Sequence, residues 1–317
     1  MTQRAHGARV RTVFLGSGSF GVEILDALAT HSDVELVGIV SAPPRPAGRK
    51  RILSPTAIDT CAREIGGTVV LTPERLRAAS AISGVLALEP GLVVLADYGQ
   101  IVPGDLLDLP HGALNLHPSL LPRHRGATPI PAAILAGDSE TGVTLIQMDT
   151  GLDTGPIIAR EVLAMAGTER APELEATLAG LAASLLATNL GPWLRGAISA
   201  TPQPMDGATL TRVLQREDGR LDPTRSSEVL EREVRAYLPW PGSFVDTLVG
   251  RIVVSEAAIG TRLDSEPGEL GVEGMAAGDG RTLLFRVVQP AGGNPMTWPE
   301  LLRGRPSLVG SRVSPAQ

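Results

Sequence analysis

The sequence predicts an α/β fold in which a Rossmann-like, doubly wound and mostly parallel sheet is followed by a smaller, mostly β second domain. Short apolar strands alternate with helix-like segments in the first half, which is typical of parallel sheets with crossover helices. A glycine-rich turn joins the first strand to the first helix, and the pattern changes after a polar, proline-containing stretch. The 317 residues, 43% of them hydrophobic, suffice for two packed domains. We predict domains at 8–197 and 209–310, joined by a linker at 198–208.

The first half of the chain supplies the strands and helices of the sheet in turn. The run at 10–15 (VRTVFL) is β-branched and aliphatic and ends in GSGSFG, after which apolar residues recur at helical spacing over 20–28. The same criteria give the remaining elements, with buried strands at 34–40, 92–95 and 113–116 and helices near 56–65 and 131–135.

The middle of the chain predicts the end of the sheet and a long helix. Two strand-like runs, 144–148 and 156–162, bracket a glycine-rich loop at 149–155 and predict a hairpin that closes the sheet. Leucines spaced three or four residues apart over 174–186 predict a long amphipathic helix that ends near Trp193.

The second half changes in pattern and predicts the smaller domain. A helix over 226–237 is stopped by a Pro-Trp-Pro-Gly sequence, and short strands follow. One of their turns, Gly278–Asp279–Gly280, contains the Asp-Gly pair that favours a tight hairpin.

The composition excludes several classes of protein. Disorder requires low hydrophobicity and high net charge, whereas this chain has 28 basic and 34 acidic residues and a net charge of −6. The single cysteine, Cys61, excludes an internal disulfide framework and a clustered thiolate metal site. We find no apolar run of the roughly 18–20 residues that span a bilayer and no apolar N-terminal segment of a secretion signal. We therefore expect a soluble, cytoplasmic protein.

Gly16, Gly18 and Gly21 form a G-x-G-x-x-G pattern between the first strand and the first helix. Such glycines let a dinucleotide pyrophosphate approach a helix N-terminus, which makes a nicotinamide-dependent oxidoreductase one alternative. That function also requires an acidic residue about 20 positions on, at the tip of the second strand. The tip here, 41–43, is Ser-Ala-Pro and carries no acid, so we favour a tight strand-to-helix turn.

Asn115 and His117 lie where a short apolar strand ends. Side chains alternate along a strand, so these two point to the same face, and open parallel sheets bind ligands beyond the carboxyl ends of their strands. An asparagine amide donates hydrogen bonds without titrating, and a histidine donates while also moving protons near neutral pH. Together they suit a developing oxyanion at an acyl carbon. The alternative is a turn-capping asparagine beside a half-buried histidine.

A carboxylate near His117 would favour a charged imidazole and accept a proton through water. The glycine-rich loop offers Asp149 and Asp153, and spacing alone does not choose between them, because either also suits a hydrogen bond within the turn. The chain has no G-x-S-x-G elbow, so we interpret Ser119 as a backbone-capping or ligand-contacting residue. The spacing of the histidines fits no metal site.

Longer motifs resemble a known family. NLHPSLLPRHRGATPI (115–130) and TGVTLIQMDTGLDTGPII (141–158) closely resemble the formyltransferases that use 10-formyltetrahydrofolate. The resemblance covers nearly the whole chain and includes both domains in the expected order. Further segments resemble the branch of this family that formylates the methionyl group of initiator tRNA: PRPAGRKRILSP (44–55), YGQIVP (98–103), REDGRLD (216–222), EREVRAYLPWPGSF (231–244) and VVQPAGGNPMTWPELLRGRP (287–306).

The resemblance implies transfer of a formyl group from 10-formyltetrahydrofolate, as co-substrate, to the α-amine of methionyl-initiator tRNA through a tetrahedral intermediate. The family's catalytic positions fall on Asn115 and His117, which would stabilise the oxyanion, and on Asp153, which would tune His117 and assist proton transfer. No metal is implied. We expect a monomer whose OB-like C-terminal domain helps to hold the tRNA. The resemblance also places Ser119, Leu120, Leu121, Pro122, Tyr98 and Gly99 at the folate, and Arg45, Arg49, Lys50 and Arg51 at the tRNA.

The sequence departs from the family pattern at three points that concern the partners. The basic loop has Ile52 and Asp59 where lysines are common. Asp97 stands where a small residue precedes the Tyr-Gly pair, close to the expected pterin, and 209–317 holds 13 arginines against 14 acidic residues. The nearest alternative is a paralogue that formylates another amine, such as a sugar nucleotide or a small metabolite, or that hydrolyses formyl-folate. A tRNA-binding protein without catalysis is a further alternative, but it gives no reason for Asn115, His117 and Asp153 to occur together.

Overall fold

The computed structural model describes residues 9–47, 52–262 and 264–313. Its chain forms two compact units, each of which gathers segments that are separate in the sequence. The domain limits predicted from the sequence, 8–197 and 209–310 with a linker at 198–208, remain a prediction. The first unit consists of Met1–Pro129, Glu140–Ala164 and Glu175–Thr211, and the second of Ile130–Ser139, Met165–Leu174 and Arg212–Gln317.

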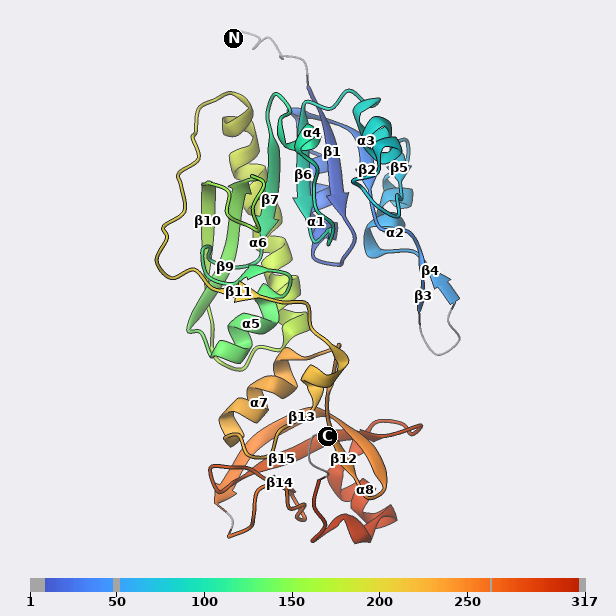
Figure 1. Cartoon of the computed structure of the whole chain (residues 1–317), viewed down its shortest axis with the longest axis vertical. Coiled ribbons are helices and arrows are strands. Elements are labelled where there is room, and N and C mark those ends of the chain that lie inside the picture. Colours follow the sequence, from blue (N-terminus) through green and yellow to red (C-terminus); the bar gives the residue numbers. More distant parts are fainter. Residues whose placement is uncertain (1–8, 48–51, 263, 314–317) are drawn as a thin grey trace, which may run out of the picture. The chain divides into compact units, whose positions relative to one another are not determined.

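Eleven strands lie in the described part of the first unit. They are β1 (Val10–Gly16), β2 (Val34–Val40), β3 (Arg45–Ala47), β4 (Ile52–Ser54), β5 (Val69–Leu71), β6 (Leu92–Ala96), β7 (Ala113–His117), β8 (Arg125–Gly126), β9 (Glu140–Gln147), β10 (Ile157–Ala164) and β11 (Leu210–Thr211). Seven of them form one sheet in the order β10-β9-β7-β6-β1-β2-β5 (Figure 1). β1 pairs in parallel with β2 and β6, and β6 with β7, whereas β9 is antiparallel to β7 and β10. The doubly wound, mostly parallel sheet and its closing hairpin are thus confirmed.

Helices cover both faces of this sheet. They are α1 (Gly21–Ala29), α2 (Ala57–Ile65), α3 (Ala79–Leu86), α4 (Gly104–Leu107) and α6 (Ala171–Leu194), whose first residues belong to the second unit. On one face Val85 of α3 and Leu106 of α4 pack into a core with Val13 of β1. Phe14 points to the other face because side chains alternate along a strand. There Phe14 and Ile58 of α2 both lie close to the first residue of α1.

Sequence signals account for the ends of several elements. α2 starts after Thr56, whose hydroxyl accepts the backbone N–H of Asp59 at 3.0 Å, the usual role of an N-cap. Several short elements of the first unit escaped prediction, among them β5, which has three residues, and α3, which has eight residues and no side-chain cap. Since β1 pairs with β2 on one side and β6 on the other, the strand order reverses between β1 and β6, and ligands of open sheets bind at such a point.

The helix α6 corrects the expectation that no segment is long and apolar enough to span a bilayer. Among the described residues it is the one helix that meets this criterion, by length and composition alone, with 24 residues. Its Leu178, Leu186 and Leu190 are completely buried. The apolar stripe is therefore used for packing within the unit, as the core helix of a globular domain uses it.

The second unit contains a five-stranded antiparallel sheet and its own core. Its elements are α5 (Pro129–Ala136), η1 (Arg216–Gly219), α7 (Ser227–Ala236), β12 (Ser243–Thr247), β13 (Gly250–Arg262), β14 (Gly274–Ala276), β15 (Arg281–Pro290), β16 (Met296–Thr297), α8 (Trp298–Gly304) and η2 (Pro306–Leu308). The strand order is β12-β13-β15-β14, with β16 also paired to β15. Register shifts along β13 bend the long strand and curl the sheet.

The core of the second unit lies between this sheet and its helices. α7 packs on β13 and β15 and starts after its N-cap, Ser226, whose hydroxyl accepts the backbone N–H of Val229. Trp298 of α8 is fully buried and meets Phe285 of β15 edge to face, with ring centroids 5.1 Å apart. Gly280 adopts a positive φ in the turn between β14 and β15. The OB-like, β-rich second domain and its Asp-Gly hairpin are confirmed.

Candidate active site

Two polar side chains are buried at the carboxyl end of β7. Asn115 and His117 are 5% and 4% exposed. Asn115 pairs with Leu95 of β6 on one side and Ile146 of β9 on the other, and His117 pairs with Thr144 of β9. Because β7 is an interior strand, its neighbours fix the backbone and thereby the direction of both side chains. Buried polar groups of this kind require partners, since an unpaired one is costly.

Asp153, in the loop between β9 and β10, lies beside both side chains and is the hydrogen-bond partner of Asn115. Its Oδ1 accepts a hydrogen bond from Asn115 Nδ2 at 3.2 Å, and its Oδ2 accepts one from the backbone N–H of Gly126 at 2.8 Å. The same Oδ2 lies 3.7 Å from His117 Nδ1. The structure thus brings Asn115, His117 and Asp153 together. Asp149 faces its own loop, where it accepts hydrogen bonds from Gly151 and Thr154.

The position of the imidazole ring determines which nitrogen faces the site. His117 Nε2 lies 2.9 Å from the carbonyl oxygen of His124. A carbonyl oxygen only accepts, so we assign the proton to Nε2. Nδ1 is then the atom that faces the Asp153 carboxylate. At 3.7 Å that pair is too far apart for a hydrogen bond but close enough for a strong charge interaction when the ring carries a second proton.

The backbone around Asp153 is tightly constrained. Asp153 has a φ of +51°, in the left-handed region that few residues other than glycine adopt. A Cβ on Gly155 would lie 1.9 Å from the carbonyl oxygen of Gln147, so only glycine fits there. Arg125 and Gln203, which sequence reasoning missed, also meet at this loop: Gln203 accepts from Arg125 and donates to the carbonyl oxygens of Asp153 and Gly155.

The residues predicted to line the folate occupy two kinds of position. Tyr98 is buried in the core, where burial raises its pKa to about 12 and where its hydroxyl has no hydrogen-bond partner among the described residues. Ser119 is fully buried and its hydroxyl donates to the carbonyl oxygen of Arg123 at 2.7 Å. Leu121 and Pro122 are buried, Leu120 is half-buried and Gly99 is exposed.

Asp97, directly after β6, closes the glycine-rich turn. The N–H groups of Ser17 and Gly18 donate to its carbonyl oxygen at 2.9 and 3.3 Å. A Cβ on Gly18 would lie 1.6 Å from Asp97 Oδ2, so glycine is needed to admit this side chain. Solvent reaches Asp97, yet the desolvation imposed by the protein around it, with the Glu175 carboxylate, raises its pKa. A carboxylate at the glycines opposes a pyrophosphate and supports the tight turn over dinucleotide binding.

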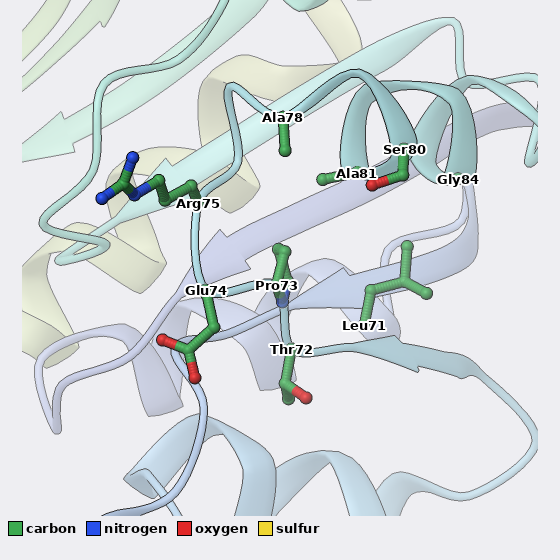
Figure 2. A pocket seen from close by; sticks show the side chains of 9 residues that line it. All are labelled: Leu71, Thr72, Pro73, Glu74, Arg75, Ala78, Ser80, Ala81 and Gly84. Atoms are coloured by element: carbon green, nitrogen blue, oxygen red, sulfur yellow. The ribbon is translucent and has the colours of Figure 1, made fainter.

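The other candidate sites in the described residues do not bring predicted catalytic side chains together. A pocket of about 520 Å³ opens between Thr72–Arg75 and the first turns of α3 (Figure 2), and none of the predicted site residues lines it. Of the predicted tRNA contacts, Arg45 is exposed on β3, whereas Arg49, Lys50 and Arg51 lie outside the described residues. Within the described ranges, no group of three or more His, Cys, Asp or Glu side chains is arranged to hold a metal ion.

Comparison with known proteins places both units in one family. Residues 10–190 match the formyl transferase family, and residues 213–306 match the C-terminal domain of formyl transferases. The chain is 43% identical over 312 residues to the methionyl-tRNA formyltransferase of Halorhodospira halophila, covering 96% of this chain and 99% of the relative. It is 42% identical over 298 residues to that of Paramagnetospirillum magneticum, covering 93% and 97%.

Solved structures share the fold at low sequence identity. HypX from Aquifex aeolicus in complex with tetrahydrofolic acid is 17% identical, with a TM-score of 0.63, covering 93% of this chain and 47% of that one. An N-formyltransferase from Helicobacter canadensis, in complex with folinic acid and dTDP-3-aminofucose, is 15% identical, with a TM-score of 0.61, covering 87% and 98%. These structures show the fold alone, whereas the family matches and the full-length relatives show that the chain belongs to the methionyl-tRNA formyltransferase family.

Proposed function

We propose that this protein transfers the formyl group of 10-formyltetrahydrofolate to the α-amine of methionyl-initiator tRNA, in the cytoplasm and as a monomer. The observation that carries the proposal is the convergence of Asn115, His117 and Asp153 at the carboxyl edge of the sheet. The relatives at 42–43% identity along nearly the whole chain are methionyl-tRNA formyltransferases, which supports the same acceptor here. We further propose 8–197 as the catalytic domain and 209–310 as the domain that helps to hold the tRNA.

The geometry supports a direct transfer without a covalent enzyme intermediate. The amine lone pair attacks the formyl carbon, and the new C–N bond converts the carbonyl oxygen to an oxyanion. The second N–H of the Asn115 amide and a proton on Nδ1 of His117 stabilise that charge, while the Asp153 carboxylate stabilises the positive charge of the ring that carries both protons. Asp153 relays the amine proton through water to the folate nitrogen, which leaves as a protonated amine when its bond to carbon breaks.

Several details of the site agree with this division of roles. Asn115 is held by Asp153 through one N–H only, and an amide carries two. The Nε2 proton of His117 is committed to the carbonyl oxygen of His124, which leaves Nδ1 for the reaction. Tyr98 and Ser119 direct their side chains into the protein interior, which leaves the backbone near them to face the folate. We therefore propose that the backbone at Gly99 and the loop Ser119–Pro122 line the folate.

A sugar nucleotide is the second candidate acceptor. Structural neighbours include sugar N-formyltransferases, but at 15–20% identity they share only the fold. The full-length relatives favour tRNA, although Arg225, Arg235 and Arg251 of the second unit are each paired with an acidic residue. We propose that the exposed Arg45 and the neighbouring Arg49, Lys50 and Arg51 contact tRNA phosphates.

The decisive experiment supplies purified protein with 10-formyltetrahydrofolate and charged methionyl-tRNA and measures folate release together with N-formylmethionyl-tRNA. We expect the two products in equal amounts. Uncharged tRNA and methionyl elongator tRNA are the matched acceptor controls, and His117→Ala is the enzyme control, in which turnover falls by orders of magnitude while folate still binds. Folate release without formylated tRNA would show that the formyl acceptor is another amine or water.

A further inference from the structure

We infer that Gln203 is a positioning residue for formyl transfer, which holds the Asp153 carboxylate in place from a segment that the sequence presents as a linker. This inference rests on the proposed function, because it assigns a task within that reaction. It concerns a residue that lies 50 positions from Asp153 in the sequence and reaches it through the backbone.

The Gln203 side chain uses every hydrogen-bonding group that it has. Its Nε2 donates to the carbonyl oxygens of Asp153 and Gly155 at 2.7 and 2.8 Å. Its Oε1 accepts from Arg125 Nη2 and Nε at 2.7 and 3.2 Å. A flipped amide would set an oxygen against two carbonyl oxygens and an NH₂ against a guanidinium, so the orientation is fixed by its partners.

These hydrogen bonds connect the two parts of the chain that position the Asp153 carboxylate, namely the backbone of Asp153 itself and the segment Arg125–Gly126. On one side the amide holds the backbone of Asp153 itself, whose φ of +51° requires support from its surroundings. On the other side it holds Arg125, and the next residue, Gly126, donates its backbone N–H to Asp153 Oδ2 at 2.8 Å. Loss of the Gln203 amide would therefore release both the carboxylate and its backbone donor.

The segment that carries Gln203 is anchored on both sides of it. Thr201 exchanges two backbone hydrogen bonds of 2.7 Å with Ile157, at the start of β10. Further on, the Thr209 hydroxyl accepts the backbone N–H of His124 at 2.8 Å, and β11 pairs in parallel with β8. All of these residues belong to the first unit.

The exposure pattern along this segment agrees with its hydrogen bonds. Of residues 201–211, Gln203, Thr209 and Thr211 are half-buried and the others are exposed. These three are the residues whose side chains bond the catalytic loops. The segment therefore presents a set of polar groups to the site while its remaining side chains face solvent.

The test compares Gln203→Met, which keeps the length of the side chain and removes its hydrogen bonds, with the wild type. We expect kcat to fall by roughly 30- to 100-fold, because displacement of a reacting group by about 1 Å has that effect. The KM for folate should change by less than about threefold. Asn189→Leu is the matched control, since the Asn189 amide donates to the carbonyl oxygen of Leu185 within α6 of the first unit, and it should leave kcat unchanged.

A double-mutant cycle with Asp153→Asn separates positioning from stability. If Gln203 acts through the Asp153 carboxylate, Gln203→Met should cost less than about threefold in the Asp153→Asn background. An equal loss in both backgrounds, or a variant with wild-type kcat, would overturn the inference. If Gln203→Met does not fold, Arg125→Met removes the guanidinium that holds the Gln203 amide. That variant must then show the same non-additivity with Asp153→Asn. No transfer by the wild type would overturn the inference and the proposed function together.

Discussion

The substitution Asp153→Asn tests the central electrostatic interaction of the site. It removes the negative charge while keeping nearly the same shape, so the loop is disturbed as little as one substitution permits. In the wild type the carboxylate lies 3.7 Å from His117 Nδ1 and accepts hydrogen bonds from Asn115 and Gly126. An amide offers one acceptor oxygen to those two donors and no charge to the imidazole.

The expected magnitude follows from the distance. Two unit charges 3.7 Å apart interact by about 4.5 kcal/mol at an effective dielectric constant of about 20, a value suited to sites near a protein surface. If His117 carries a full positive charge in the transition state but not in the enzyme–substrate complex, loss of the Asp153 charge corresponds to a decrease in kcat of about 10³-fold. Folate binds before the positive charge forms on His117, so the affinity of Asp153→Asn for folate should differ from that of the wild type by less than about threefold.

The assay is single-turnover formyl transfer at saturating folate and methionyl-tRNA, with folate affinity measured separately by equilibrium binding. Asp149→Asn is the matched control, because Asp149 lies in the same loop but bonds only Gly151 and Thr154 among the described residues. It should retain wild-type kcat. A decrease of less than tenfold in Asp153→Asn, or an equal decrease in the control, would refute the electrostatic argument.

Three further predictions address other parts of the chain. Because desolvation by the surrounding protein, with the Glu175 carboxylate, raises the pKa of Asp97, the contribution of Asp97 to stability is present below the ordinary aspartate pKa and disappears as the pH rises through the raised pKa. Asp97→Asn should therefore be more stable than the wild type at pH 7.5 and show a flatter dependence on pH in chemical denaturation. Changing Arg49 and Lys50 together to Ala should raise the KM for tRNA and reduce the slope of log KM against log salt by about 0.7–0.9 for each phosphate that the variant no longer neutralises, measured by steady-state kinetics. Trp298→Ala should destabilise the second unit by about 3–5 kcal/mol in calorimetry, since Trp298 is fully buried against Phe285.

The fold was predictable to the extent that its signals are local. The strands at 10–15 and 34–40 and the helix over 226–237 appear within a residue or two of the predicted positions, because apolar periodicity and caps mark them directly. β5 and α3 carry weak signals and form because the sheet and its core hold them. α6 was predicted as a helix, but the expectation that no segment is long and apolar enough to span a bilayer was wrong for it. A helix buried in a core has the same apolar composition as a membrane span.

The site was predictable where topology converts sequence position into spatial position. Two polar residues with a period of two at a strand end must share one face, so Asn115 and His117 could be paired without a structure. The choice of Asp153 over Asp149 depended on the family resemblance, because spacing left both open. The structure adds a geometric reason, since the left-handed backbone at Asp153 carries its carboxylate to the end of β7. The approach of Asp97 to Gly18 joins two strand ends and has no signal within either segment.

The segment at 198–208 shows why the remainder of the site could not be found from sequence. Proline, glycine and exposed polar residues mark it as irregular, and irregular segments between domains resemble one another in composition whether or not they bond to anything. Its hydrogen bonds to the site join groups that lie tens of positions apart in the chain. Gln203 holds the backbone of Asp153, and directly beyond this segment Thr209 holds His124, whose carbonyl oxygen fixes the imidazole of His117. The stretch whose composition predicts a linker, together with Thr209 directly after it, therefore supports both titratable members of the site, and no pattern within the stretch distinguishes that task from a simple connection.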